Sequence, residues 1–259
     1  MILERSLYKK VRKLKQKEED IVGFFLKLLK ILRNKKYHVN PVSIDLTIEE
    51  ITALCVGLIN SEQTMYFYNS IETGANKVDI SKNLALYYEI TDEETAIETL
   101  NWLCERGHHV YFDAIKEFVS GRTTTIDDTY LTEEEKSCTY EYIKNLNSTI
   151  INLMENGYLG KIEDVANSSI FAWDMGRLVL VTRCCCELGY IPKDVAWKYM
   201  EFARKKSCEI YLDWKEFAQG YILGRAMWGG SNLILNGVIK ITNGLLEDKN
   251  SPWKKYWLH

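Results

Sequence analysis

The sequence is poor in the residues that break helices and in those that hold metals. Its 259 residues include only three prolines and four histidines. Few prolines leave long stretches free to be helical, and few histidines leave little material for metal chemistry. The seven cysteines are an odd number without the spacing of a disulfide framework, which excludes a disulfide-stapled secreted domain. No hydrophobic signal sequence precedes the chain, so we expect a cytoplasmic protein.

The sequence also lacks the motifs that would name a reaction. It has no Walker loop, dinucleotide fingerprint, His-Glu-x-x-His zinc motif or ordered Ser/His/Asp set, so we expect no cofactor and assign no catalytic residue. The run Cys184-Cys185-Cys186 cannot converge on one ion, because successive helical residues point about 100° apart. We interpret these cysteines as small buried hydrophobic residues and expect no metal site. No stretch approaches the roughly 20 apolar residues of a membrane span.

Apolar residues instead recur at spacings of three and four, and hydrophobic residues make up 46% of the chain. This pattern predicts an all-α fold, a single multi-helix globular domain with a basic helical arm at its N-terminus. Thr47 with Glu50, and Thr132 with Glu135, form capping boxes that mark two helix starts. The expected helices span approximately 47–59, 76–88, 92–107, 108–119, 132–157, 163–188, 192–208, 213–228 and 233–246. Residues 60–75 and 120–132 are expected to be loops.

Charge divides the chain into an arm, residues 1–40, and an α-helical domain, residues 41–259. Residues 1–36 hold 12 Lys/Arg and 4 Asp/Glu, which leaves 21 and 32 of the chain's 33 and 36 for the remainder. Opposite charges favour docking of the arm onto the domain. The amphipathic segment 21–36 could instead contact a membrane surface, which we do not favour, and we expect no nucleic-acid partner.

Two clusters of polar and aromatic residues interrupt the apolar helices near the C-terminus. Asp174 and Arg177 lie three residues apart, and Tyr221, Arg225 and Trp228 lie four and three apart, so each set shares one helix face. One interpretation is a structural brace in which Asp174 pairs with Arg225 or Arg177. The other is a pocket in which arginines hold a carboxylate or phosphate and aromatic rings stack on the ligand. The ligand-binding candidates are Trp173, Asp174, Arg177, Trp214, Tyr221, Arg225 and Trp228.

Two small features add to these clusters. Gly220 and Gly224 lie four residues apart in a helix interior, which predicts a close crossing with the helix that carries Asp174. His108 and His109 follow Gly107 at a helix junction, where they are expected to be capping or loop residues, with acid-base or metal chemistry as the alternative.

The same residues carry a resemblance to a family. The chain resembles the bacterial domain of unknown function 1266 family over about Leu46 to Trp257, in the stretches Ala172–Arg177, Gly189-Tyr190, Ala196-Trp197, Trp214–Phe217, Gly220–Trp228, Ser251–Trp253 and the upstream block from Tyr88 to His108. The resemblance implies a single α-helical domain and marks these positions without giving them roles.

Two functions follow as hypotheses, and whether the protein is an enzyme stays open. The first, which we favour, is a noncatalytic protein-interaction domain, for example an immunity or regulatory protein, whose acidic body meets a basic protein partner. The second is an enzyme or small-ligand binder with an anion pocket built from Asp174, Arg177, Tyr221, Arg225 and Trp228.

Overall fold

The computed structural model describes residues 37–42 and 45–259, and these residues are all-α, with no strand among them. In chain order the α-helices are α2 (Ile48–Val56), α3 (Leu58–Thr64), α4 (Lys77–Tyr87), α5 (Glu93–Glu105), α6 (His109–Val119), α7 (Glu133–Glu155), α8 (Phe171–Leu188), α9 (Lys193–Ile210), α10 (Trp214–Gly229), α11 (Leu233–Glu247) and α12 (Pro252–Lys255), with 3-10 helices η1 (Ile126–Asp128) and η2 (Ile162–Asn167). The predicted fold class is therefore confirmed for the described residues. The basic arm up to residue 36 lies outside them, and so do its expected docking onto the domain and the membrane contact that was not favoured.

Local signals in the sequence fix several of these helix ends. Thr47 and Glu50 exchange side-chain to backbone hydrogen bonds of 3.2 and 2.8 Å at the start of α2, and Thr132 and Glu135 do the same at the start of α7 with 3.3 and 2.9 Å. Both predicted capping boxes are confirmed. At the other end of a helix, α8 stops at Gly189, whose φ of 81° places it in the left-handed region.

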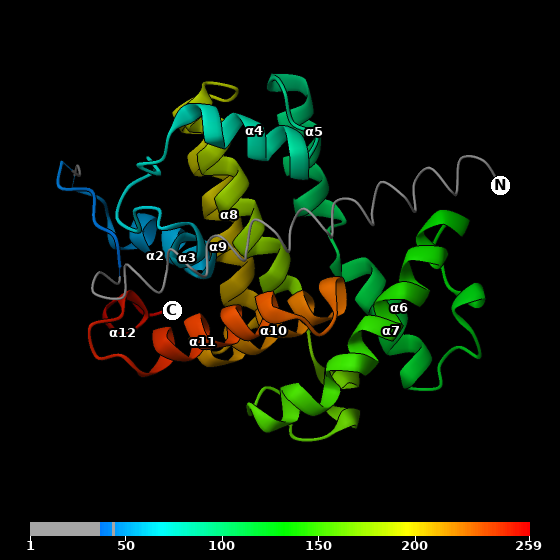
Figure 1. The fold of residues 1–259 in the computed structure, drawn as a ribbon. Coiled ribbons are helices and arrows are strands. Elements are labelled where there is room, and N and C mark those ends of the chain that lie inside the picture. The colour runs from blue at the N-terminus through cyan, green and yellow to red at the C-terminus, as the bar shows by residue number, and fades with distance from the viewer. Residues whose placement is uncertain (1–36, 43–44) are drawn as a thin grey trace. The chain divides into compact units, whose positions relative to one another are not determined.

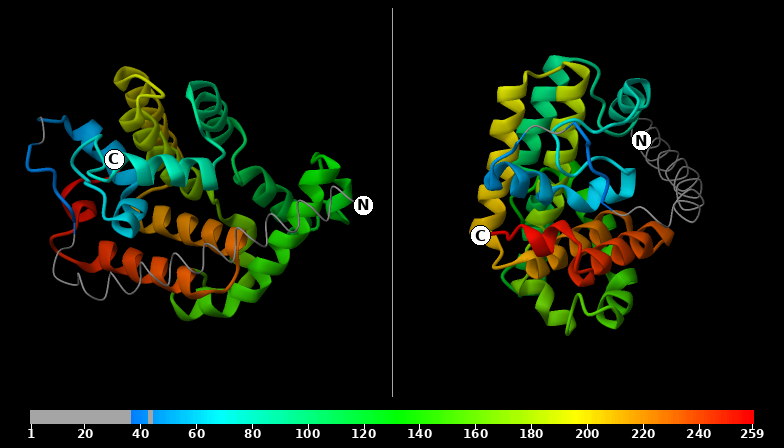
Figure 2. Two further views of the ribbon diagram at one scale, coloured as in Figure 1. Left: turned by 45° about the horizontal axis from the view of Figure 1, so that its top comes forward. Right: turned by 90° about the vertical axis from the view of Figure 1, so that its left-hand side faces the viewer.

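Helix α8 is the centre of the domain. It is buried on nearly every side, and it packs against α9, α10, α5, α4, α2 and α3. Figure 1 shows α8 and α9 upright and side by side, with α10 and α11 crossing below them, and both views of Figure 2 keep α10 beside α11. A helix with apolar residues on most of its sides belongs in the interior of a domain, and the charged residues that α8 buries there need partners.

Three expectations about elements were wrong. A helix was predicted over 163–188, but α8 begins at Phe171, because residues 162–167 form the separate 3-10 helix η2. The loop expected over 60–75 begins inside helix α3, and the loop over 120–132 contains η1. That second loop is also not wholly exposed, because Ile126 and Leu131 are buried.

The N-terminal boundary of the compact unit lies at Tyr37. Asn40 is buried and its side chain donates to Ser70 Oγ at 3.2 Å and to Glu72 Oε2 at 3.1 Å. The residues just before Pro41 are therefore tied to the loop that follows α3. Within the described part of the chain, no helix has both the length and the apolar character needed to cross a membrane.

Candidate functional site

Asp174 lies in the first turn of α8 and holds the N-terminus of α6. Its side chain is fully buried, and its two oxygens accept hydrogen bonds from the backbone N–H groups of His108 and His109, each at 2.9 Å. No side chain of α6 itself caps this end. A carboxylate suits the site, because the first N–H groups of a helix lack internal partners and carry a partial positive charge. Asp174 is thus a cap supplied by a distant helix.

Gly107 makes room for this carboxylate. Its φ of 53° lies in the left-handed region, and a Cβ at this position would stand 2.4 Å from Asp174 Oδ2. Any larger residue would combine backbone strain with a clash against the buried acid. The sequence Gly107-His108-His109 is therefore one unit, in which the glycine permits the approach and the next two residues supply the donors.

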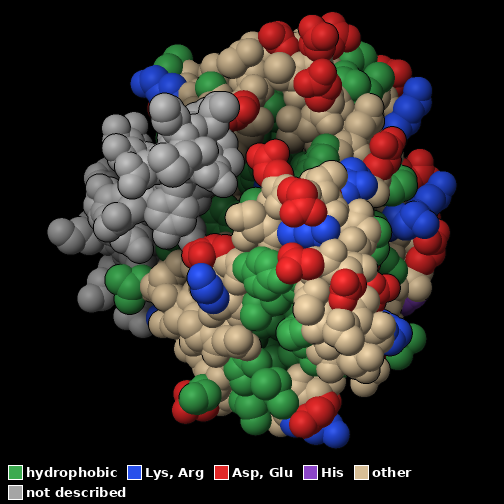
Figure 3. Space-filling model, turned by 90° about the vertical axis from the view of Figure 1, so that its right-hand side faces the viewer, with side chains coloured by type: hydrophobic (Ala, Val, Ile, Leu, Met, Phe, Trp, Pro, Cys, Tyr) green, Lys and Arg blue, Asp and Glu red, His purple; other side chains and the backbone are tan. Residues whose placement is uncertain are grey.

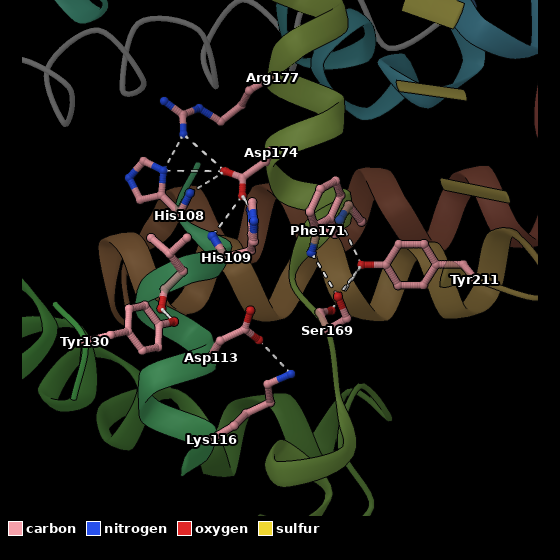
Figure 4. Close-up of polar contacts among 12 residues, drawn as sticks. His108, His109, Asp113, Lys116, Tyr130, Ser169, Phe171, Asp174, Arg177 and Tyr211 are labelled. Carbon is pink, nitrogen blue, oxygen red and sulfur yellow. Dashed lines mark hydrogen bonds and ion pairs between the residues drawn. The ribbon is translucent and has the colours of Figure 1, made fainter. Parts of the chain in front are cut away.

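The two histidines contact the carboxylate in different ways (Figure 4). His109 Nδ1 lies 3.0 Å from Asp174 Oδ2 and must carry a proton to donate to it. His108 Nδ1 lies 2.8 Å from Arg177 Nη1. Because a guanidinium can only donate, His108 Nδ1 must present a lone pair, which places the ring proton on Nε2 and leaves the ring neutral. The polar chain therefore runs from His109 through Asp174 to Arg177 and His108.

The pKa values in this cluster follow from burial and charge. Burial first, and then the charge of Arg177, lower the pKa of His108, against the opposing effect of Asp174. Burial alone would raise the pKa of Asp174, but the hydrogen bond from the His109 ring and the charge of Arg177 hold that pKa well below its usual range. Asp174 is therefore ionised while His108 is neutral.

Arg177 connects the cap to a cluster between α8 and α10. Its guanidinium lies 5.4 Å from the Tyr88 ring centroid, 5.3 Å from that of Trp173, and 4.0 Å from Asp174 Oδ1. On α10, the Arg225 guanidinium lies over the Trp228 ring at 5.1 Å. Aromatic faces attract guanidinium groups, so the rings fix both cations in place. We call Trp173, Arg177, Tyr221, Arg225 and Trp228 the α8–α10 cluster.

The predicted close crossing of the two helices is confirmed at Gly224. A Cβ on Gly224 would lie 2.5 Å from the Cβ of Trp173, so only a glycine allows α10 to approach α8 this closely. Gly220 faces a different neighbour, since its missing Cβ would meet the carbonyl oxygen of Ser169 and the hydroxyl of Tyr211. The Trp173 ring packs against Tyr221 at 5.2 Å and Trp228 at 6.0 Å.

The predicted ion pair between Asp174 and Arg225 was wrong. The partners of Asp174 are the two histidines of α6 and Arg177 of its own helix. The prediction failed because it paired the nearest charges on two crossing helices and did not consider a helix N-terminus as the counter-charge. The notion of a brace survives with different members, and Arg177 was the correct alternative.

Two buried donors in the α8–α10 cluster, Trp173 Nε1 and the Tyr221 hydroxyl, make no hydrogen bond of acceptable geometry among the described residues. Asn60 is close enough to the Tyr221 hydroxyl to lower its pKa, but its Oδ1 is likewise without a hydrogen bond there. Tyr221 is completely buried, and burial raises the pKa of its hydroxyl. The charges of Arg225 and Arg177 both act on this hydroxyl. Buried polar groups are nearly always hydrogen-bonded, so two neighbouring exceptions require an explanation.

Trp214 lies outside the α8–α10 cluster. Its ring stacks on Trp253 with centroids 4.9 Å apart, and its Nε1 donates to the Tyr256 carbonyl oxygen at 2.8 Å. These contacts join the start of α10 to the C-terminal helix α12. Trp214 therefore has a structural environment unlike that of the other ligand-binding candidates.

Arg183 is a buried cation that the sequence analysis did not identify. Its guanidinium donates to the carbonyl oxygens of Phe67, Glu72 and Ile71 and to Ser61 Oγ, at 2.6 to 3.2 Å. Burial lowers its pKa to about 10. No local signal marks this residue, because the carbonyl groups come from a loop more than a hundred positions away. Among the described residues, no group of His, Cys, Asp and Glu could hold a metal ion.

Comparison with known proteins assigns the chain to a family but supplies no activity. No curated protein matched the chain, and no solved structure did. A family model described as "Protein of unknown function (DUF1266)" matches residues 83–257, so the match begins later than the expected Leu46. It includes α5, α6, α8 and α10, and hence Gly107, the Asp174 cap and the α8–α10 cluster. The chain belongs to the DUF1266 family.

Proposed function

We propose that this domain binds a small anion at the α8–α10 cluster. The observation that carries the proposal is a pair of buried donors that find no acceptor in the described part of the chain, Trp173 Nε1 and the Tyr221 hydroxyl, on rings that pack together near Arg177. An unsatisfied buried donor costs about 1–3 kcal/mol, so a stable domain that keeps two of them on neighbouring rings is suited to an acceptor from outside the chain. A carboxylate, sulfate or phosphate group supplies acceptors and no donors.

The electrostatics of the cluster also favour an anion. The guanidinium of Arg177 packs over two aromatic rings, and among the described residues its one carboxylate contact is with Asp174 Oδ1 at 4.0 Å. The oxygens of that carboxylate are already occupied by N–H groups of His108 and His109. Asp174 is therefore a distant and incomplete counter-ion for Arg177. Guanidinium groups held by aromatic faces are preorganised for carboxylate or phosphate recognition.

The geometry changes two parts of the pocket hypothesis. The rings of Trp173 and Trp228 lie against the guanidinium groups, so they orient the arginines instead of stacking on a ligand ring. Asp174 is a poor general base, because a carboxylate whose pKa is held low has little tendency to take a proton. The proposal is therefore noncatalytic ligand binding, with Arg177, Arg225, Tyr221 and Trp173 as the binding groups.

Thermal unfolding with sulfate tests this proposal. Sulfate at ten times its dissociation constant would stabilise the domain by about 1.4 kcal/mol, and chloride at the same ionic strength serves as the reference. Tyr221→Phe should weaken the effect of sulfate. Tyr158→Phe is the matched control, because the Tyr158 hydroxyl is bound to Asn243 Oδ1 at 2.6 Å, outside the cluster. If phosphate, sulfate and acetate all stabilise the protein no more than chloride does, the proposal is wrong.

A role as a protein-interaction domain is the second candidate, and the charge of the sequence favours it. Residues 37–259 carry 21 Lys/Arg and 32 Asp/Glu of the chain's 33 and 36. Figure 3 shows one face on which Asp and Glu side chains are spread, with Lys and Arg among them. Such a surface suits a basic protein partner, as an immunity or regulatory protein would require. Failure of the purified protein to bind any basic protein at low ionic strength would count against this role.

A further inference from the structure

His108 Nδ1 faces a donor and an acceptor at the same time. Arg177 Nη1 lies 2.8 Å from it and Asp174 Oδ1 lies 3.5 Å from it. Without a proton, this nitrogen accepts from Arg177. With a proton, it would donate to Asp174 and could no longer accept from the guanidinium. The protonation state of one atom therefore decides whether Arg177 is tied to His108.

Among the described residues, the other groups around the His108 ring offer no further hydrogen-bond partner to Nδ1 besides Arg177 and Asp174. The imidazole is 9% exposed, and its charged neighbours are Asp174 and Arg177, both from α8. The remaining groups that face it are Trp102 of α5, His109 and Tyr111 of α6, and Tyr142 of α7. Burial raises the pKa values of Tyr111 and Tyr142, so both phenols are neutral near pH 7. Burial is the largest cause that lowers the pKa of the ring, and the charges of Arg177 and His109 lower it further, whereas Asp174 raises it. Withdrawal of Arg177 therefore shifts the balance toward the protonated ring.

We propose that anion binding at Arg177 is coupled to the uptake of one proton from solvent by His108 Nδ1. The inference rests on the proposed anion site and states how that site is regulated. A bound anion attracts the Arg177 guanidinium and withdraws it from His108. The freed lone pair of Nδ1 takes a proton, and the new N–H donates to Asp174 Oδ1, which already lies 3.5 Å away. His108 is in this scheme a positioning residue for Arg177, and the anion does not touch it.

The sign of the pH dependence follows from linkage. An anion that neutralises Arg177 removes a cation that disfavours the imidazolium, so binding raises the affinity of His108 for a proton. By reciprocity, protonation of His108 raises the affinity for the anion. The anion should therefore bind more tightly at lower pH, with a change of up to about tenfold per pH unit when one proton is taken up.

Isothermal titration of the full chain with sodium sulfate tests the coupling, because sulfate keeps its charge between about pH 5.5 and about pH 8, the range in which histidine titrates. Titrations at one pH in two buffers of different ionisation enthalpy report the number of protons bound. The wild type should take up a proton on binding. His108→Gln, which can accept from Arg177 but cannot be protonated, should bind sulfate without proton uptake. His109→Gln is the matched control and should behave as the wild type does, because His109 contacts Asp174 but not Arg177.

The outcomes separate the two proposals. Sulfate binding without proton uptake in the wild type would overturn the coupling and leave the anion site standing. Proton uptake that persists in His108→Gln would overturn it as well. No sulfate binding at any pH would refute the anion site and the coupling together. Two-bond nitrogen–proton NMR of the free wild type needs no variant, and a protonated His108 Nδ1 near pH 7 would contradict the inference.

Discussion

Replacing Asp174 with Ala tests whether this carboxylate fastens α6 to α8. The substitution would leave one buried N–H group, the backbone of His108, and two partly buried ones, the backbone and ring Nδ1 of His109, without their acceptor. A buried donor that loses its partner costs about 1–3 kcal/mol. We therefore expect Asp174→Ala to lower the free energy of unfolding by roughly 3 to 6 kcal/mol, a large part of the 5–15 kcal/mol that is usual for a domain.

The measurement is urea unfolding followed by circular dichroism at about 222 nm, where the signal reports helix content. Asp194→Ala is the matched control, because Asp194 is also a helical acid but is 75% exposed and lies 4.0 Å from Lys198. The control should change stability by no more than about 0.5 kcal/mol. If Asp174→Ala were as mild as the control, the carboxylate would not hold the start of α6, and the argument for the cap would fail.

Three further substitutions test the surroundings of this cap and the anion site. Gly107→Ala should lower the free energy of unfolding by at least about 2 kcal/mol. Gly157 also has a positive φ but has open space around it, so Gly157→Ala should cost only about 1 kcal/mol. The shift of the urea midpoint measures both. The folded pKa of Asp174 lies below its unfolded value of about 3.9, so its contribution to stability is complete above that value and is lost as the pH falls. Below about pH 4 the wild type should therefore lose stability more steeply than Asp174→Asn. Equal slopes in pH-dependent unfolding would contradict this. Tyr221→Phe should leave the stability of the ligand-free protein unchanged or raised. Tyr211→Phe is the control and should cost about 1–2 kcal/mol, because the backbone N–H of residue 172 loses its acceptor. A large loss from Tyr221→Phe in thermal unfolding would mean that its hydroxyl already has a partner.

Sequence reasoning identified the residues of the candidate site better than their contacts. It selected Asp174, Arg177 and Arg225 because charges inside apolar helices need compensation, and Tyr221 because it shares a helix face with Arg225; all four are buried or nearly so. It did not give His108 and His109 their role as the partners of Asp174. The signal was present in Gly107, which marked a helix junction, but a junction in the sequence does not reveal which side chain will cap it.

The sequence by itself determined the local structure. Capping boxes at Thr47 and Thr132 and the stop at Gly189 depend on residues within one or two turns, so their geometry is encoded in a short stretch. The apolar spacing likewise determined the helical class. The sequence pattern did not predict helix starts that depend on distant groups, and α8 is an example, because its start was placed at the wrong residue.

Only the tertiary structure decided the partners of the buried charges. Asp174 meets histidines 65 and 66 positions away, and Arg183 meets carbonyl groups more than a hundred positions away. The free energy of each buried charge depends on which donors and acceptors the packing brings within about 3 Å, and helical periodicity carries no information about that choice. The close approach of α8 and α10 at Gly224 is the part that could be foreseen, because the absence of a side chain lets two helix backbones come closer together.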